Sequence, residues 1–370
     1  MSDIRRPLAA TCAALSLALA LALAAPASAE DAPLGFVTGA ANPEDLVALD
    51  GTQWVVVSAM RSKDRKGSLM AVDTRAPAAA VPLYSGPAAF APHGIAARAR
   101  GGGQFELLVV DHGTGEAIAR MVIEVGDHRP PRVVGVARVR LPTGVSANGV
   151  APLPDGGFAV TSMFDPRDPG HVDKLAARAP TGAIWRWSPG AGWREIVRPR
   201  LSGANGIAVS PDGKTLFASE WAARRIWRIP LDGGEPRSAP TAFLPDNLRW
   251  MRDGGLLVAG QTASPRGLFG CQDGKARCPM GFTVAVVDPA TLAVRPLVGG
   301  DAASFAATGF GGATGAIQVG DEIWVGSFTG DRVARFRGSV HPWGSTASRR
   351  PKIWRRVTQP LMPPRLLPIW

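Results

Sequence analysis

Residues 204–220 read Ala204-Asn-Gly-Ile-Ala-Val-Ser-Pro-Asp-Gly-Lys-Thr-Leu-Phe-Ala-Ser-Glu220. The segment holds two short apolar runs, one starting at Ile207 and one at Leu216, and the turn signal Pro211-Asp-Gly213 lies between them. Apolar runs of this length on either side of an Asp-Gly turn are typical of a β-hairpin. A polar Asn-Gly element directly precedes the first run. The stretch therefore predicts two antiparallel strands, the first entered through a polar residue.

The second run of this hairpin recurs along the chain. Its six copies are Trp54–Ser58, Leu107–Asp111, Phe158–Ser162, Leu216–Glu220, Leu256–Gly260 and Ile323–Ser327. A turn signal precedes most copies and another strand-like stretch follows each, so residues 30–337 divide into six units of about 51 residues, the size of a four-stranded propeller blade. No long apolar period of 3.6 residues appears between the runs, which disfavours a parallel α/β sheet. The sequence predicts an all-β, six-bladed β-propeller, with the segment near Phe36 completing the last blade.

Charge is unevenly distributed over the 370 residues. The formal net charge is +11, but Arg337 to Trp370 alone contribute seven basic residues and no acidic one. Residues 30–336 carry only about +3, which is ordinary for a soluble surface. We therefore expect no nucleic-acid partner. The basic tail, residues 338–370, contains three tryptophans among prolines; it is either a poorly ordered extension or a weak contact for an anionic membrane surface.

The first 29 residues have the pattern of a secretory signal. Arg5 and Arg6 precede an apolar run from Leu8 to Ala25, and Ala27-Ser-Ala29 supplies small residues for cleavage after Ala29. An uncleaved membrane anchor is the alternative. Export predicts a periplasmic or secreted protein, in which Cys271 and Cys278 are expected to form a loop disulfide.

A second element recurs about ten residues before each run, and it varies in an informative way. The six versions are Glu44-Asp-Leu46, Pro92-His-Gly-Ile95, Ala147-Asn-Gly-Val150, Ala204-Asn-Gly-Ile207, Asp246-Asn-Leu248 and Thr314-Gly-Ala-Ile317. In a propeller these positions meet where the innermost strands begin. We expect one shared metal site formed by Glu44, Asn148, Asn205, Asp246 and Asn247. Carboxylate and amide oxygens without sulfur suit Ca²⁺. Because Asn-Gly is also a common turn dipeptide, loop turns are the alternative for Asn148 and Asn205.

Two of the five histidines lie at the recurring elements of the second unit. His93 lies in the recurring polar element, and His112 directly follows the strand that ends at Asp111. Beside a metal-polarised carbonyl, a neutral imidazole can take a proton from water, and a second imidazole can tune it. Incidental placement is the alternative. The sequence contains no Gly-x-Ser-x-Gly elbow, His-Glu-x-x-His motif or Walker loop.

At these residues the chain resembles the calcium-dependent six-bladed propellers, which include paraoxonase/arylesterases, gluconolactonases of the senescence-marker-protein family and strictosidine synthase-like proteins. The resemblance covers about residues 36–337, and the histidines make the paraoxonase/arylesterase branch the most similar. It implies that the five oxygen-bearing residues hold a catalytic calcium and that His93 and His112 form the dyad. Gly149 stands where paraoxonases carry an acid, which puts their second, structural calcium in doubt although Asp45 and the Ile95 carbonyl remain. Their long disulfide between the chain ends is also absent.

The function expected from the sequence is calcium-dependent hydrolysis of a small lactone or aryl ester by a monomer. In this scheme Ca²⁺ polarises the carbonyl oxygen while His93 and His112 activate water. Two alternatives are a strictosidine synthase-like protein and a non-catalytic calcium-bearing propeller that binds a ligand or an envelope partner, because a fold alone does not settle function.

Overall fold

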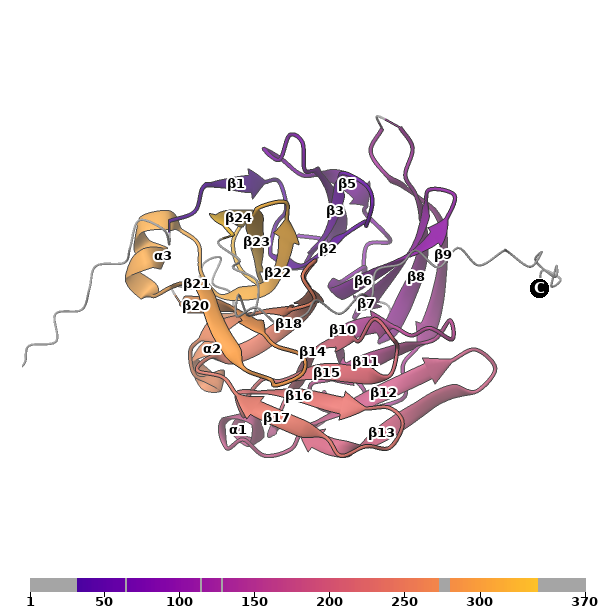
Figure 1. Cartoon of the computed structure of the whole chain (residues 1–370), viewed down its shortest axis with the longest axis vertical. Helices are drawn as coiled ribbons and strands as arrows, with labels where there is room; N and C mark the ends of the chain where they lie inside the picture. The colour runs from indigo at the N-terminus through magenta and orange to yellow at the C-terminus, as the bar shows by residue number, and fades with distance from the viewer. Residues whose placement is uncertain (1–31, 64, 114, 128, 273–279, 339–370) are drawn as a thin grey trace, which may run out of the picture.

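The computed structural model describes residues 32–338 except 64, 114, 128 and 273–279. The expected signal segment and nearly all of the basic tail lie outside these residues. The described part forms 24 strands in six four-stranded antiparallel sheets, arranged around a central axis (Figure 1). The predicted six-bladed propeller is confirmed.

Each blade has one innermost strand beside the axis (Figure 1). These strands are β2 (Pro43–Ala48), β6 (Pro92–Gly101), β10 (Ala147–Pro152), β14 (Ala204–Val209), β18 (Leu244–Trp250) and β22 (Ala313–Val319). The strands next to them match the six recurring runs: β3 (Trp54–Ala59), β7 (Gln104–Asp111), β11 (Phe158–Ser162), β15 (Thr215–Glu220), β19 (Leu256–Thr262) and β23 (Glu322–Ser327).

Two further strands complete each blade toward the outside. The third strands are β4 (Ser68–Asp73), β8 (Ala117–Glu124), β12 (Gly182–Ser188), β16 (Arg225–Pro230), β20 (Gly281–Val287) and β24 (Arg332–Arg337). The outermost are β5 (Val81–Tyr84), β9 (Arg132–Arg140), β13 (Gly192–Leu201), β17 (Arg237–Pro240), β21 (Val294–Gly300) and β1 (Gly35–Thr38). Because β1 pairs with β24, with Phe36 opposite Ala334, the first described strand completes the last blade as expected.

Apolar residues pack mainly between neighbouring blades. One cluster joins Leu108 and Val110 of the second blade to Val150, Phe158 and Val160 of the third, all at most 2% exposed. Each sheet thus contributes both faces to the core, which explains why the second strands read as continuous apolar runs. At the hairpin turn of the fourth blade, Gly213 has φ of +72°, a left-handed conformation that favours glycine.

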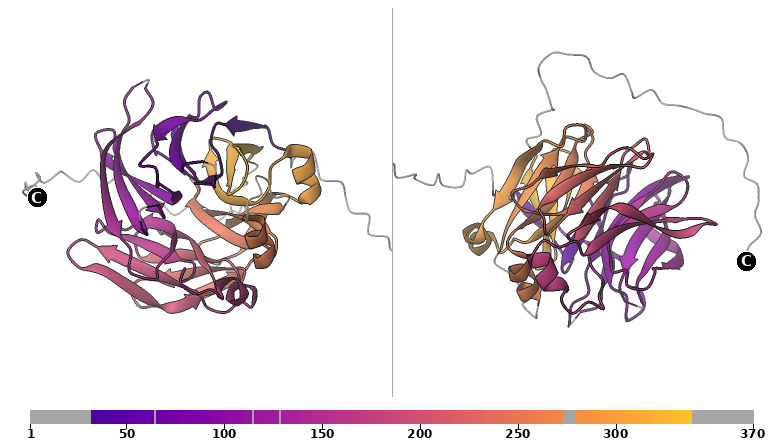
Figure 2. Two further views of the ribbon diagram at one scale, coloured as in Figure 1. Left: turned by 180° about the vertical axis from the view of Figure 1, so that it is seen from behind. Right: turned by 90° about the horizontal axis from the view of Figure 1, so that it is seen from below.

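The described residues also form three short helices: α1 (His171–Ala176), α2 (Pro265–Gln272) and α3 (Ala302–Thr308). The first two lie side by side at one face of the ring, joined by an ion pair between Arg266 and Asp173 at 2.6 Å (Figure 2). None of the described helices is long and apolar enough to cross a membrane.

Candidate metal and catalytic site

A β-bulge at the start of every innermost strand shapes the site. The register between the first two strands of each blade shifts at this point, for example between Ala204 and Ile207 in the fourth blade. A bulge leaves extra residues unpaired and redirects their side chains. The residues that it redirects are those of the recurring polar element. Asn148 and Asn205 therefore lie in strands β10 and β14, and the alternative that they form loop turns is wrong.

Glycines behind this element let the innermost strands approach one another. A Cβ on Gly94 would lie 2.3 Å from the carbonyl oxygen of Asn148, and one on Gly206 would lie 2.2 Å from that of Asp246. The same relation joins Gly149 to Asn205, with 3.0 Å between the added Cβ and the carbonyl oxygen. Each glycine thus makes room for the polar residue of the next blade.

Hydroxyl groups fix the backbone of the polar residues. The Ser219 hydroxyl donates to the carbonyl oxygen of Asp246 at 2.6 Å, and the Thr314 hydroxyl donates to that of Glu44 at 2.6 Å. In both cases the hydroxyl belongs to the preceding blade. The backbone positions of Asp246 and Glu44 are therefore set by contacts between blades, not by their own strands alone.

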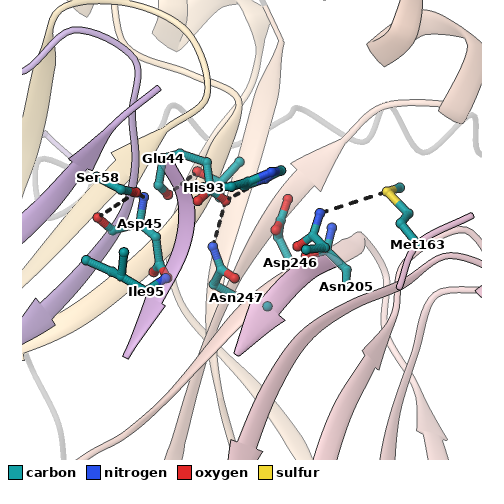
Figure 3. Close-up of polar contacts among 12 residues, drawn as sticks. Glu44, Asp45, Ser58, His93, Ile95, Met163, Asn205, Asp246 and Asn247 are labelled. Atoms are coloured by element: carbon teal, nitrogen blue, oxygen red, sulfur yellow. Dashed lines mark hydrogen bonds and ion pairs between the residues drawn. The ribbon is translucent and has the colours of Figure 1, made fainter. Parts of the chain in front are cut away.

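The polar residues open into a cavity of about 400 Å³. Four of the five predicted metal ligands line it, namely Glu44, Asn148, Asn205 and Asp246, and both predicted catalytic residues, His93 and His112, line it as well. Asn247 does not line the cavity but is buried beside it, where its Nδ2 donates to Glu44 Oε1 at 2.8 Å (Figure 3). The fold therefore brings together predicted site residues that lie up to about 200 positions apart in the sequence.

The oxygens of this cluster lack hydrogen-bond donors. Glu44 Oε2, Asn148 Oδ1, Asn205 Oδ1 and Asp246 Oδ1 are all buried, and none accepts a hydrogen bond from the described residues. Native proteins rarely bury unsatisfied polar atoms, so four in one cavity require an explanation. A cation provides one, because carboxylate and amide oxygens are the ligands that Ca²⁺ takes.

The electrostatics of the cluster agree with this interpretation. Burial, reinforced by the neighbouring charges of Asp45 and Asp246, raises the pKa of Glu44 well above its ordinary value. Burial likewise raises the pKa of Asp246 from 3.8 to about 8. Two carboxyl groups that resist ionisation when alone become favourable partners once a positive ion is present. The residues thus fit a calcium ion, with Glu44, Asn148, Asn205 and Asp246 able to reach it and Asn247 holding Glu44.

The donor set is rich in amides. Within the described ranges, no group of three or more His, Cys, Asp and Glu side chains is gathered as a metal site. The candidate cluster has only two carboxylates in the cavity, and its other oxygens come from asparagines. Amide and carboxylate oxygens are the ligands that Ca²⁺ accepts, whereas zinc sites use thiolates and imidazoles.

Behind Asp246 lies a polar chain that sequence reasoning missed. Gln261 is fully buried, and its Nε2 donates to Asp246 Oδ2 at 2.8 Å, while the Trp221 indole donates to Gln261 Oε1 at 2.9 Å. These bonds orient Asp246 so that its other oxygen faces the cavity. The available signal was a polar residue directly after the apolar run Leu256–Gly260.

The two histidines are linked to each other and to a glutamate. His93 Nδ1 lies 2.9 Å from His112 Nε2, and both carboxylate oxygens of Glu116 lie 2.9 Å from His112 Nδ1. An ionised carboxylate only accepts, so His112 donates from Nδ1 to Glu116 and accepts at Nε2 from His93 Nδ1–H. This leaves His93 Nε2 without its proton. Sequence reasoning found the pair but missed Glu116, which follows His112 by four residues.

His93 is held in a form able to accept a proton. Burial, with His112 nearby, lowers the pKa of His93 from 6.5 to about 3, so the ring is neutral at pH 7. Its Nε2 lies 3.6 Å from Glu44 Oε1, at the edge of the oxygen cluster. The proton acceptor and the candidate cation site are therefore adjacent.

Much of the remaining cavity wall is apolar, although Ser146, Gln261 and Thr314 also line it. Its larger apolar side chains are Met60, Met163, Phe164, Trp221, Leu268, Phe269 and Phe328. Leu268 and Phe269 belong to α2, and Phe269 packs edge-to-face on Trp221 with 6.0 Å between the ring centroids. Cys271, near the end of the same helix, is disulfide-bonded, and its predicted partner Cys278 lies outside the described residues. The cavity thus combines a polar end with an apolar, partly aromatic wall.

Comparison with known proteins agrees with the fold. Residues 120–262 match the model of the SMP-30/gluconolactonase/LRE-like region. No curated protein sequence matches the chain. A luciferin-regenerating enzyme superposes with a TM-score of 0.52 at 15% identity, over 83% of this chain and 93% of that chain.

Two more solved structures superpose with a TM-score of 0.50. Each match covers 84% of this chain and 97% of the other chain. One is a putative gluconolactonase at 16% identity. The other is a calcium-binding protein, regucalcin, from Agrobacterium tumefaciens strain C58, at 14% identity. Identities this low show similarity of fold. Together with the family match, they confirm the resemblance to the superfamily of six-bladed propellers that includes gluconolactonases.

Proposed function

We propose that the protein is a calcium-dependent hydrolase of apolar lactones or aryl esters. The observation that carries the proposal is the set of four buried, unsatisfied oxygens beside the bare Nε2 of His93. A bound calcium ion would polarise the carbonyl oxygen of the substrate and stabilise negative charge on it. The gluconolactonase-type family match and the calcium-binding propeller among the similar structures support a lactonase-like hydrolase.

The chain's own residues supply the proton transfer. Water placed near His93 Nε2 gives its proton to that atom while its oxygen attacks the acyl carbon. The bond between the acyl carbon and the ester oxygen then breaks, and the departing oxygen takes the proton back from His93. His112, held by Glu116, keeps the His93 ring in the orientation and tautomer that this requires.

The apolar wall selects the rest of the substrate. Phe164, Trp221 and Phe269 offer aromatic surface but few hydrogen-bond partners, which suits an alkyl or aryl group better than a polyhydroxylated ring. The wall therefore favours aryl esters and alkyl-substituted lactones over sugar lactones.

The test compares hydrolysis of a lactone and ester panel before and after chelation of Ca²⁺. We expect activity to disappear with chelator and return with Ca²⁺, and to fall at least 100-fold in His93→Gln and in Asp246→Ala. Asp232→Ala, at an exposed loop position, is the matched control and should retain full activity. Undiminished turnover in the chelated protein would refute a calcium mechanism, and calcium binding without any turnover would favour a ligand-binding propeller.

A further inference from the structure

Arg249 forms a second centre in the channel wall, outside the lining of the catalytic cavity. Its guanidinium nitrogens donate to the carbonyl oxygens of Leu46 at 3.0 Å, Ile95 at 2.6 Å and Leu248 at 2.8 Å, and also to Asp45 Oδ2. The bonded oxygens belong to β2, β6 and β18, so one side chain joins the first, second and fifth blades. The Arg249 side chain is 14% exposed and that of Asp45 is 1% exposed.

Four oxygens converging on one point need a positive charge. Three of them are backbone carbonyls and the fourth belongs to a carboxylate, and such a group repels itself unless a cation lies among its members. Metal ions meet this need in many proteins, and the resemblance to paraoxonases raised Asp45 and the Ile95 carbonyl as ligands of a second calcium. Here a guanidinium satisfies the same two groups. Its several N–H donors are spread over one plane, whereas a metal ion is a single point charge.

The residues around Asp45 show how this centre is separated from the cavity. Asp45 follows Glu44 in β2, yet only Glu44 lines the cavity, since the bulge between Pro43 and Asp45 redirects the Glu44 side chain (Figure 3). Asp45 also accepts from the backbone N–H of Leu46 and of Ile95, each at 2.9 Å. The carboxylate is therefore fully engaged without a metal ion.

We propose that Arg249 is a built-in cation that takes the place of a second metal ion, so that the chain binds calcium only at the Glu44–Asp246 cluster. A second calcium does not fit, because the guanidinium already bonds the oxygens that would hold it. The position of Arg249 also ties the first and second blades to the fifth, next to the strands that carry Glu44 and His93. The single ion expected on wild type rests on the proposed function, whereas the role of Arg249 is tested by the difference in bound ions between wild type and Arg249→Ala.

The experiment counts calcium ions bound per chain, by equilibrium dialysis against buffered Ca²⁺ followed by elemental analysis. Wild type is expected to bind one ion, and Arg249→Ala is expected to bind one more than wild type, because Asp45 and three carbonyl oxygens lose their cation. Two ions on wild type would overturn the proposal. So would an Arg249→Ala protein that folds and binds the same number as wild type.

Two further variants keep the test decisive. Asp45→Asn combined with Arg249→Met removes both charges, and we expect it to fold and to bind the same number of ions as wild type, even if Arg249→Ala alone does not fold. Binding of an additional ion by this double variant would refute the assignment, since its carboxylate is gone. Asp246→Asn, introduced into wild type and into Arg249→Ala, tests the other site separately. If it removes the ion of wild type but leaves the additional ion of Arg249→Ala, the two centres are distinct. If it removes both ions, the result counts against the proposal.

Discussion

Replacing Asp246 with asparagine is expected to stabilise the metal-free protein and to abolish its stabilisation by calcium. Asp246 is buried, and its pKa is raised from 3.8 to about 8 when no cation is present. At pH 7 the folded protein must therefore keep a proton on a group that the unfolded chain would ionise. Asparagine has nearly the same shape as the protonated acid, and its amide can take over the bond from Gln261.

The size of the effect follows from proton linkage. Unfolding releases the proton at every pH between 3.8 and 8, and each pH unit above 3.8 costs the folded state 1.36 kcal/mol. At pH 7 the cost is about 4 kcal/mol, which the asparagine variant avoids. Wild type recovers this amount when calcium is present at about 1,000 times its dissociation constant, since ligand binding stabilises the folded state by a similar amount.

The assay is urea unfolding at pH 7, followed by tryptophan fluorescence, with a calcium chelator and with excess Ca²⁺. Asp246→Asn should unfold at higher urea than wild type in chelator, and its midpoint should not move when Ca²⁺ is added. Asp127→Asn, at an exposed turn, is the control and should behave as wild type in both conditions. A variant that is less stable than wild type in chelator, or that gains as much from Ca²⁺, would refute the reasoning.

Three other predictions rest on the same geometry. Because the raised pKa of Asp246 lets the unfolded chain lose its proton first, metal-free stability should fall as the pH rises from about 4 to 8; the increase in melting temperature caused by Ca²⁺ should grow over that range, and an increase that does not vary with pH would contradict this. Gly206→Ala places a Cβ 2.2 Å from the Asp246 carbonyl oxygen and should cost about 1–3 kcal/mol and weaken Ca²⁺ binding in calorimetry, whereas Gly126→Ala, with open space around it, should do neither. Glu116→Gln should lower kcat about 10-fold or more at unchanged Ca²⁺ affinity, because His112 loses the acceptor that fixes its tautomer; equal losses of affinity and kcat would indicate a general structural role.

The sequence predicted the parts of this protein that repeat. Six similar apolar runs are enough to identify a propeller, and the polar element before each run marks a position that symmetry brings to the axis. Glu44, Asn148, Asn205 and Asp246 could be grouped for this reason, although up to about 200 residues separate them.

The contacts that escaped prediction have no counterpart in the other blades. Gln261, Glu116 and Arg249 act through specific side-chain hydrogen bonds, some of them between blades, and no periodic pattern in the sequence reports such contacts. Helix α2, which supplies part of the apolar wall, sits in a loop insertion within the fifth blade. Insertions of this kind follow no repeat, so the shape of the cavity could be learned only from the fold.

Because β1 pairs with β24, the candidate site can form only at a late stage of folding, once the propeller has closed. Candidate ligands and their supports extend from Glu44 in the first blade to Thr314 in the last, and they encircle the axis only after the two ends of the propeller have been joined. A nascent or truncated chain would hold the same side chains as an open arc, with no common centre for a cation. Calcium affinity would then report whether the ring has closed. Deletion of the short strand Gly35–Thr38 should weaken calcium binding, although this strand contributes no candidate ligand.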